Sequence, residues 1–460
     1  MTERSRLDRR QFLTRSALAA GAMTVGAPFD ALLARGPQQP RRGRGPSPDY
    51  GPLQPAIDET TGLPLLLLPA DFRYVSFGWT GELMSDGIAT PGVHDGMAAF
   101  PGGHGRVHLI RNHEVGDGPD AFAPAIAYDE QAGGGTTTLE FDTLRGRLVH
   151  SYASISGTVR NCAGGSTPWG SWLTCEETTL GPGAAPRDLL KNHGYIFEVP
   201  VHGQAVTTPY KEMGRFSHEA VAVDPATGDV YETEDQGDDS GMYRFRPTVP
   251  GQLQHGGTLE MLGVAGQLKF DTRTGQNGDW LDLTWYTIDN PDPDLASGET
   301  KVFTQGFNKG GARFGRLEGA WYGNGRIYFV STSGGDARQG QVFELDPLNN
   351  RMRLLFESPS ADVLNAPDNI CVSPRGGLVL CEDGSGAEFV HGLTTDGVIF
   401  RFAQNNVDLR QTPVLGFNGN YTGSEVCGAC YSPDGKWLFF NIQSPGITFA
   451  VTGPWGSGGL

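Results

Sequence analysis

A short unit of three apolar strands separated by turns recurs along the chain, and this repeat limits the possible folds more than any other feature. In its clearest copy, residues 219–224 and 230–234 are strands joined by a turn, and residues 241–245 form a third strand. One such unit cannot bury its hydrophobic faces alone, so each copy must stack against its neighbours. The repeat therefore predicts a set of small packed sheets.

The copies are numerous enough to suggest a closed ring. Further copies lie near residues 107, 161, 318, 368 and 428, and in the copy near residue 368 the third strand is expected at residues 397–400. About six units of paired hairpins predict an all-β, six-bladed β-propeller, with an array of β-sandwiches as the alternative. The last copy lacks a clear outer strand, and a strand at residues 73–77 would complete it from the other end of the chain. The uneven spacing predicts long inter-blade loops, the longest over residues 248–308.

Composition agrees with this fold class and limits the binding partners. The chain has 67 Gly and 31 Pro among 460 residues, which favours many turns and short strands. The formal net charge is −17, and such a surface repels nucleic acid and anionic membranes while it concentrates cations. A negatively charged phosphate substrate would also be repelled. Hydrolysis of such a substrate therefore needs bound metal ions that make the local electrostatic potential positive.

The N-terminal segment has the form of an export signal. Arg9 and Arg10 are followed by Phe12 and Leu13, and then by a weakly apolar run of small residues. We predict a twin-arginine signal peptide over residues 1–34, with a chance Arg pair as the alternative. The expected partner is the twin-arginine export machinery, and the expected location is periplasmic or extracellular without stable membrane insertion.

The rest of the chain divides into a linker and one domain. Residues 35–50 are rich in Pro, Gly and Arg and predict a disordered linker. Residues 51–460 are expected to form the single β-propeller domain.

Acidic residues fall at matching positions in several copies. The first strand of a blade lines the central channel and the second runs antiparallel beside it, so the start of one and the end of the other share a mouth. Glu219 and Glu234 are 15 residues apart, and Asp368 and Glu382 are 14 apart. The corresponding positions elsewhere hold Asn161 and Glu176, Glu318 and Ser333, and Glu114. Carboxylates crowded at one mouth repel each other unless cations lie among them, and oxygen ligands of this kind suit calcium.

Cysteines add a softer ligand to this prediction. Cys175 stands beside Glu176, which indicates a transition metal as well as calcium. For any single acid, a solvated turn residue is the alternative. Cys427 and Cys430 form a lone CxxC motif, which is weak evidence for metal or redox chemistry and is more often an ordinary pair near a turn.

Several motifs of the chain are shared with one known family. They are residues 111–114, 167–177, 216–220, 234–245, 316–319, 367–369, 381–383 and 441–446. In these motifs the chain resembles the PhoX family of bacterial alkaline phosphatases. The resemblance implies a six-bladed propeller with a mixed iron and calcium cluster at the channel mouth. It also implies hydrolysis of phosphomonoesters outside the cytosol.

The resemblance assigns roles to particular residues. Cys175 is implied to be an iron ligand, and Glu219 and Glu318 are implied to be carboxylate ligands of the cluster. Further metal ligands implied by the motifs are Glu176, Glu114, Glu234, Asp368 and Glu382. Arg316 is expected to bind the substrate phosphate, because a guanidinium can hold two of its oxygens. His218 is a candidate for phosphate contact, with a structural histidine as the alternative.

Together these features predict a secreted metal-dependent phosphatase that acts on small phosphate esters, with Arg316 and His218 as catalytic residues. Two alternatives remain open. One is a calcium-dependent, lactonase-like propeller hydrolase, whose site needs few acids and no thiolate. The other is a non-catalytic binding propeller stabilised by calcium. The fold by itself does not choose among these functions, because propellers host many of them.

Overall fold

Short apolar segments of five to eight residues make up most strands, because each small sheet is covered on both faces by its neighbours. In β25 (Leu438–Ile442), for example, all five residues are buried. The computed structural model describes residues 48–116, 120–183 and 188–460. Within them the longest helix is α2 (Val302–Lys309). Short 3-10 turns are formed by Pro124–Ile126, Lys211–Met213, Leu253–His255, Leu295–Ser297 and Trp455–Ser457.

Three blades come from the first part of the body. Blade 1 contains β4 (His94–Gly103), β5 (Arg106–His113), β6 (Gly134–Asp142) and β7 (Arg147–Thr158). Blade 2 contains β8 (Asn161–Ser166), β9 (Ser171–Glu176) and β10 (Ile196–Pro200). Blade 3 contains β11 (His218–Val223), β12 (Val230–Glu234), β13 (Met242–Pro247) and β14 (Gly257–Val264). All neighbouring strands within each blade are antiparallel.

Three more blades follow. Blade 4 contains β16 (Leu317–Gly323), β17 (Arg326–Ser331), β18 (Gln341–Asp346) and β19 (Arg351–Glu357). Blade 5 contains β20 (Pro367–Val372), β21 (Leu378–Glu382), β22 (Phe389–Leu393) and β23 (Ile399–Asn405), and β2 (Leu66–Leu68) and β1 (Gln54–Ala56) extend its outer edge. Blade 6 contains β24 (Val426–Tyr431), β25, β26 (Ile447–Thr452) and β3 (Arg73–Phe77).

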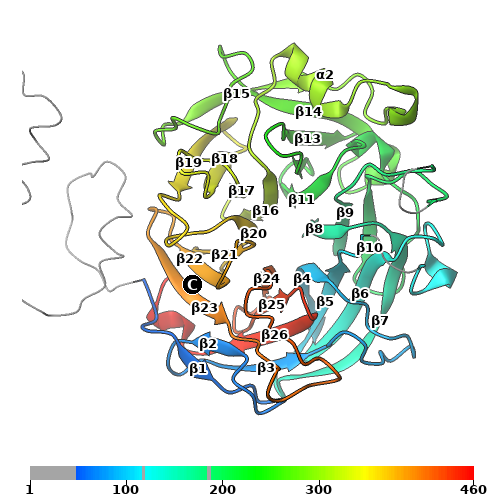
Figure 1. The fold of residues 1–460 in the computed structure, drawn as a ribbon. Helices are drawn as coiled ribbons and strands as arrows, with labels where there is room; N and C mark the ends of the chain where they lie inside the picture. The colour runs from blue at the N-terminus through cyan, green and yellow to red at the C-terminus, as the bar shows by residue number, and fades with distance from the viewer. Residues whose placement is uncertain (1–47, 117–119, 184–187) are drawn as a thin grey trace, which may run out of the picture. The chain divides into compact units, whose positions relative to one another are not determined.

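The first strands of the six blades form a closed ring around the centre (Figure 1). Each contacts the next in chain order, from β4 through β8, β11, β16, β20 and β24 and back to β4. The predicted all-β β-propeller is therefore confirmed. The N-terminal strand β3 pairs with β26 from Thr448↔Phe77 to Thr452↔Arg73, so the predicted sharing of one blade between the two ends of the body is also confirmed.

The hydrogen-bonded sheets are fewer than the six expected blades. Strand β15 (Leu281–Thr287) pairs with β14 on one side and with β19 on the other, which joins blades 3 and 4 into one nine-stranded sheet. Residues 248–308, predicted to be the longest loop, therefore hold β14, β15 and part of α2. That prediction was wrong because polar residues interrupt the apolar pattern of β15, which carries Asp282 and Thr284.

One strand assignment within blade 5 also differs. The segment near residues 397–400 was expected to be the third strand, but the third strand is β22 and this segment begins the fourth strand, β23. The sequence of β22 includes His391 and Gly392, which hide its strand character.

The predicted signal peptide at residues 1–34 lies outside the described residues, and so does the predicted linker except for residues 48–50. There the side chain of Tyr50 donates a hydrogen bond to the carbonyl of Leu460, at 2.7 Å. In the part of the chain that the structure describes, no helix has the length and apolar character needed to cross a membrane.

Candidate metal centre

The six first strands share a local irregularity near their N-terminal ends. In β11, for example, His218 pairs with Glu234 but the next regular pair is Val221 with Glu232, so the register shifts between them. Equivalent shifts occur in β4, β8, β16 and β20, and one residue later in β24. A bulge of this kind re-aims side chains and is common beside functional sites.

The turn next to each bulge is also repeated six times. The residue that follows the second strand donates a backbone hydrogen bond to the carbonyl of the residue that precedes the first strand, over 2.8–3.1 Å. The six bonds are Glu114 to Val93, Glu177 to Arg160, Asp235 to Ser217, Thr332 to Arg316, Asp383 to Ala366 and Gln443 to Glu425. The blades therefore present corresponding residues at one mouth of the channel.

Two sets of equivalent side chains follow from this geometry. The second residues of the first strands, which we call the bulge ring, are Asp95, Cys162, Glu219, Glu318, Asp368 and Cys427. The residues after the second strands, which we call the loop ring, are Glu114, Glu177, Asp235, Thr332, Asp383 and Gln443. Nine acids lie at this mouth when Glu425, which precedes β24, is counted with the two rings.

This mouth holds three groups of potential metal ligands. Within each group, one ligand atom from every residue lies within 4.8 Å of the others. The groups are Cys162 with Glu177 and Glu219, Glu219 with Glu318 and Asp368, and Asp95 with Glu425 and Cys427. The first two groups share Glu219. Each group combines residues from at least two blades, so the ring of blades is what brings the ligand atoms together.

The electrostatics of the mouth favour bound cations. Burial, followed by the charges of Asp368 and Glu177, raises the pKa of Glu219 well above its ordinary value. Burial and the neighbouring Asp383 raise the pKa of Asp368 to about 8. A cation among these carboxylates would remove the repulsion that holds their pKa values high.

Two carboxylates have no hydrogen-bond donor of their own. Asp95 is 3% exposed and Asp368 is 8% exposed, and none of the described residues donates a hydrogen bond to either side chain. Buried carboxylates normally have hydrogen bonds or coordinate metals. The donor set therefore fits metal ions, with carboxylate oxygens in all three groups and one thiol in each of two.

Arg316, predicted to bind phosphate, lies at this mouth. It pairs with Asp235 at 3.0 Å and with Glu318, and its side chain is 36% exposed. Burial by itself would lower the pKa of Arg316, but Glu318 and Asp235 outweigh that effect and raise it. The guanidinium is therefore a permanent positive charge among the acids.

Of the predicted metal ligands, the structure brings Glu219, Glu318 and Asp368 together and places Glu114 in the loop ring. The remaining predicted acids end the second strands and hold loops of their own blades. Glu176 accepts hydrogen bonds from the amides of Val159, Gly194 and Tyr195 and from His193. Glu234 accepts hydrogen bonds from Gly241 and Tyr243. Glu382 accepts hydrogen bonds from Asn365, Phe389 and His391. Their oxygens are thus already occupied within the protein.

Cys175 and His218 belong to none of the three groups. Cys175 is fully buried in a hydrophobic cluster with Leu173 and Ile196, where burial and then the charges of Glu232 and Glu219 raise the pKa of its thiol. His218 is also fully buried, its ring lies 3.6 Å from that of Phe216, and its Nε2 lies 3.1 Å from the carbonyl oxygen of Gly214. Burial lowers the pKa of His218 to about 3, so these positions give the predicted metal and catalytic roles no support.

Several residues of the mouth were not predicted from the sequence. They are Asp95, Cys162, Glu177, Asp235, Asp383 and Glu425, and Cys427 was noted only as part of a CxxC motif. The repeated backbone hydrogen bond locates them. Glu177, Asp235 and Asp383 donate it, Glu425 accepts it, and Asp95, Cys162 and Cys427 stand two residues after an acceptor, a pattern visible only when all six turns are aligned.

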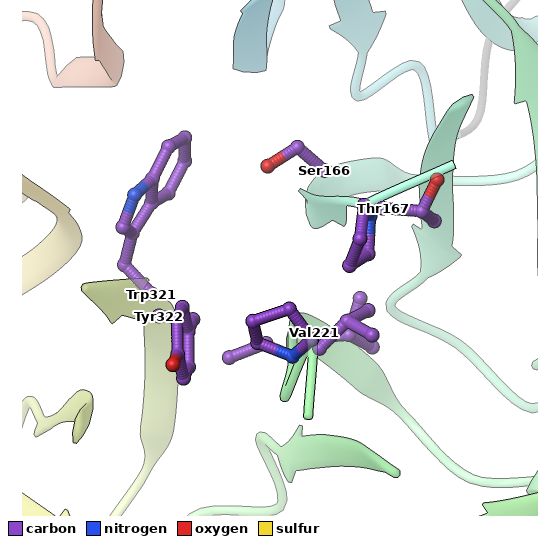
Figure 2. A pocket seen from close by; sticks show the side chains of 9 residues that line it. Ser166, Thr167, Val221, Trp321 and Tyr322 are labelled. Atoms are coloured by element: carbon purple, nitrogen blue, oxygen red, sulfur yellow. The ribbon is translucent and has the colours of Figure 1, made fainter. Parts of the chain in front are cut away.

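The opposite end of the channel is apolar. A cavity of about 240 Å³ lies at the C-terminal ends of the first strands of blades 2, 3 and 4, lined by Ser166, Thr167, Pro168, Val221, Ala222, Val223, Pro225, Trp321 and Tyr322. Figure 2 shows Trp321 on one side of this cavity and Ser166 and Thr167 on the other. Trp321 packs against the hydrophobic clusters of several blades, so it fills the end of the channel that the acids leave free.

Comparisons with known proteins identify one matching family. The family model described as alkaline phosphatase PhoX matches residues 48–151 and 140–446. A search of curated proteins finds no match. Among solved structures, a gluconolactonase from Xanthomonas campestris is similar at 12% identity, over 89% of this chain and 99% of that chain, with a TM-score of 0.44. Regucalcin, a calcium-binding protein from Agrobacterium tumefaciens, is similar at 11% identity, over 82% and 96%, with a TM-score of 0.37.

Proposed function

The chain belongs to the PhoX alkaline phosphatase family, and on this premise we propose that it hydrolyses phosphomonoesters at a metal centre formed by the bulge ring. Family membership supports a phosphatase. The observation that carries the site is the convergence of Cys162, Glu219, Glu318 and Asp368 in two ligand groups that share Glu219.

The donor atoms suggest which ions bind. The group of Glu219, Glu318 and Asp368 offers only carboxylates, which suits a hard cation such as calcium. The groups that contain Cys162 and Cys427 each add one sulfur, which suits a transition metal such as iron. We therefore propose iron and calcium together, with Cys162 in the role that the sequence had suggested for Cys175.

Bound cations and Arg316 would have separate roles in phosphoryl transfer. Bound cations would stabilise charge on the phosphate oxygens and lower the pKa of an attacking water. Arg316 would donate hydrogen bonds to the phosphate and hold it over the bulge ring. Asp235 and Glu318 orient the Arg316 guanidinium before the substrate arrives. Positioning and charge neutralisation supply most of the catalysis in such reactions.

We also propose that the enzyme acts outside the cytosol. Export through the twin-arginine route would place the enzyme in the periplasm or outside the cell, where it would release phosphate from small esters. A folded protein with its metals already bound suits that route, since ligands from two or three blades must be assembled before an ion can bind.

The test is to purify the exported protein, measure its iron and calcium, and assay p-nitrophenyl phosphate with and without a chelator. We expect both metals, with activity that the chelator removes and added metal restores. Lactone hydrolysis with calcium alone, or calcium binding without any hydrolysis, would instead support one of the two alternative functions.

A further inference from the structure

Arg160 occupies the position in blade 2 that Arg316 occupies in blade 4. Each precedes the first strand of its blade, and its carbonyl accepts the repeated backbone hydrogen bond, at 2.9 Å for Arg160 and 2.8 Å for Arg316. Each has a positive φ, 51° and 46° respectively, a conformation that non-glycine residues seldom adopt. Each also lies two residues before a proposed ligand, Cys162 or Glu318.

The two arginines flank the shared ligand of the centre. Blade 3, which carries Glu219, lies between blades 2 and 4 in the ring. Among the six residues that precede the first strands, these two are the basic ones; the other four are Val93, Ser217, Ala366 and Glu425. A mouth dominated by acids therefore presents one guanidinium on each side of Glu219.

The contacts of Arg160 match those of Arg316. Arg160 pairs with Glu177 at 2.9 Å and with Glu114 at 3.3 Å, and its side chain is 45% exposed. As with Arg316, burial by itself would lower its pKa, but Glu177 and Glu114 outweigh this and raise the pKa. Both arginines use Nε and Nη2 for these pairs, and none of the described residues accepts a hydrogen bond from Nη1 of either one.

One of the two acids that hold each arginine belongs to a metal group. Glu177 lies in the group with Cys162, and Glu318 lies in the group with Asp368. A cation that binds these carboxylates competes for the same oxygens, which frees guanidinium N–H donors for an anion above the metals.

We infer that Arg160 is a second phosphate-binding residue, which acts with Arg316 as a two-sided clamp around the substrate phosphate. This inference rests on the proposed function and specifies its substrate class. Two arginines and the bound cations together need three free phosphate oxygens, which a monoester dianion has and a diester lacks. The clamp therefore selects monoesters over diesters.

The experiment compares Arg160→Ala and Arg160→Lys with the wild-type, metal-loaded protein. The binding constant for inorganic phosphate is measured by calorimetry, and hydrolysis is measured with p-nitrophenyl phosphate and with bis-p-nitrophenyl phosphate. We expect Arg160→Ala to weaken phosphate binding and to lower kcat/KM for the monoester by about 10- to 100-fold, with a much smaller effect on the diester. Lysine should recover part of the loss, since it keeps the charge but not the fork of donors.

A matched control separates this effect from general loss of surface charge. Arg338 is 59% exposed, pairs with Asp238 at 3.0 Å, and lies outside both rings. We expect Arg338→Ala to leave phosphate binding unchanged, and metal content should stay at the wild-type level in all three variants.

Two results would overturn the inference. One is unchanged phosphate binding in Arg160→Ala, and the other is a loss of metal that accounts for the loss of activity, which would make Arg160 only a support for Glu177. Weakened phosphate binding in a protein that hydrolyses no phosphate ester would instead support the clamp and reject the proposed function.

Discussion

The two ends of the channel are built from the same six strands, yet they have opposite chemistry. In β16, Glu318 belongs to the acidic mouth, and Trp321, three residues further on, fills the far end. In the other five first strands, the residues three positions after the bulge-ring residue are Ala98, Gly165, Ala222, Cys371 and Cys430. One indole is therefore accompanied by five small residues. The far end gains stability from packing, whereas the mouth accumulates negative charge that Arg160 and Arg316 offset only in part.

This difference separates the part of the molecule that holds the ring together from the part that we propose to react. Unpaired buried carboxylates are unfavourable for folding unless a cation compensates them. Apolar packing at the far end is favourable without any ligand. Substitutions at the two ends should therefore have different readouts, and the following tests examine that separation.

The largest effect is expected for Glu219→Gln at the mouth. Glu219 belongs to two ligand groups, so its loss should reduce metal content and lower kcat/KM by about 1000-fold or more. The chelated variant should unfold at the same temperature as the chelated wild type or higher, because a repelling carboxylate has been removed. Full activity with full metal content would place the reactive centre elsewhere. Ser166→Ala at the far end is the control and should change neither the metal content nor kcat/KM.

A comparison of two cysteines sharpens the boundary of the mouth. Cys162→Ser should remove the transition metal and lower activity by about 100-fold, since a weaker ligand replaces a proposed thiolate. Cys175→Ser should keep its metal but lose about 1–3 kcal/mol of stability, because it buries a hydroxyl among apolar side chains. Metal analysis and urea unfolding measure the two outcomes. The reverse pattern would restore Cys175 as the ligand.

Trp321→Ala tests the far end. Removal of the indole should cost about 2 kcal/mol of unfolding free energy, less than for a fully packed aromatic residue, because Trp321 is only partly buried and lines a cavity. Metal content should be unchanged and kcat nearly so. Urea unfolding combined with a phosphatase assay measures both, and Trp321→Phe should show a smaller loss. A fall in metal content would mean that the two ends are coupled.

The smallest expected effect is a dependence of the metal-free protein on pH. Burial raises the pKa of Glu177 to about 8, and the same holds for Asp368. Because the folded pKa lies above the unfolded one, the folded state binds protons more tightly, and stability is lost as pH rises from about 4.5 to about 8. Thermal unfolding of the chelated protein should show this decline, and added metal should reduce it. A melting temperature that rises across this range would contradict the account.

The sequence predicted the propeller because its strands, turns and repeat are local features. It also predicted that Glu219, Glu318 and Asp368 share a mouth, since residues at equivalent positions of repeated units must converge. The prediction from the sequence failed in blade 2, where it was wrong by one position. The spacing of 15 matched Asn161 to Glu219, but Asn161 pairs with Glu176 whereas His218 pairs with Glu234. The first hairpin of blade 2 is therefore one residue shorter than that of blade 3, and Cys162 is the residue equivalent to Glu219.

Other parts of the site depend on contacts between blades, which a single repeat does not reveal. Asp95 was missed because its unit was counted from the second strand near residue 107. Glu176 and Glu382 were counted as ligands because the pattern of acids cannot show that loop amides already occupy their oxygens. Within the described residues, hydrogen bonds rather than residue type distinguish the acids that hold loops from those free to bind ions.

The pairing of β3 with β26 has a consequence for how the protein is made. The ring closes with one of its first-synthesised strands against one of its last, so translation must be almost complete before the seam can form. Until then the nascent molecule is an open arc with two uncovered flanks, and truncation yields an unfinished arc rather than a smaller wheel.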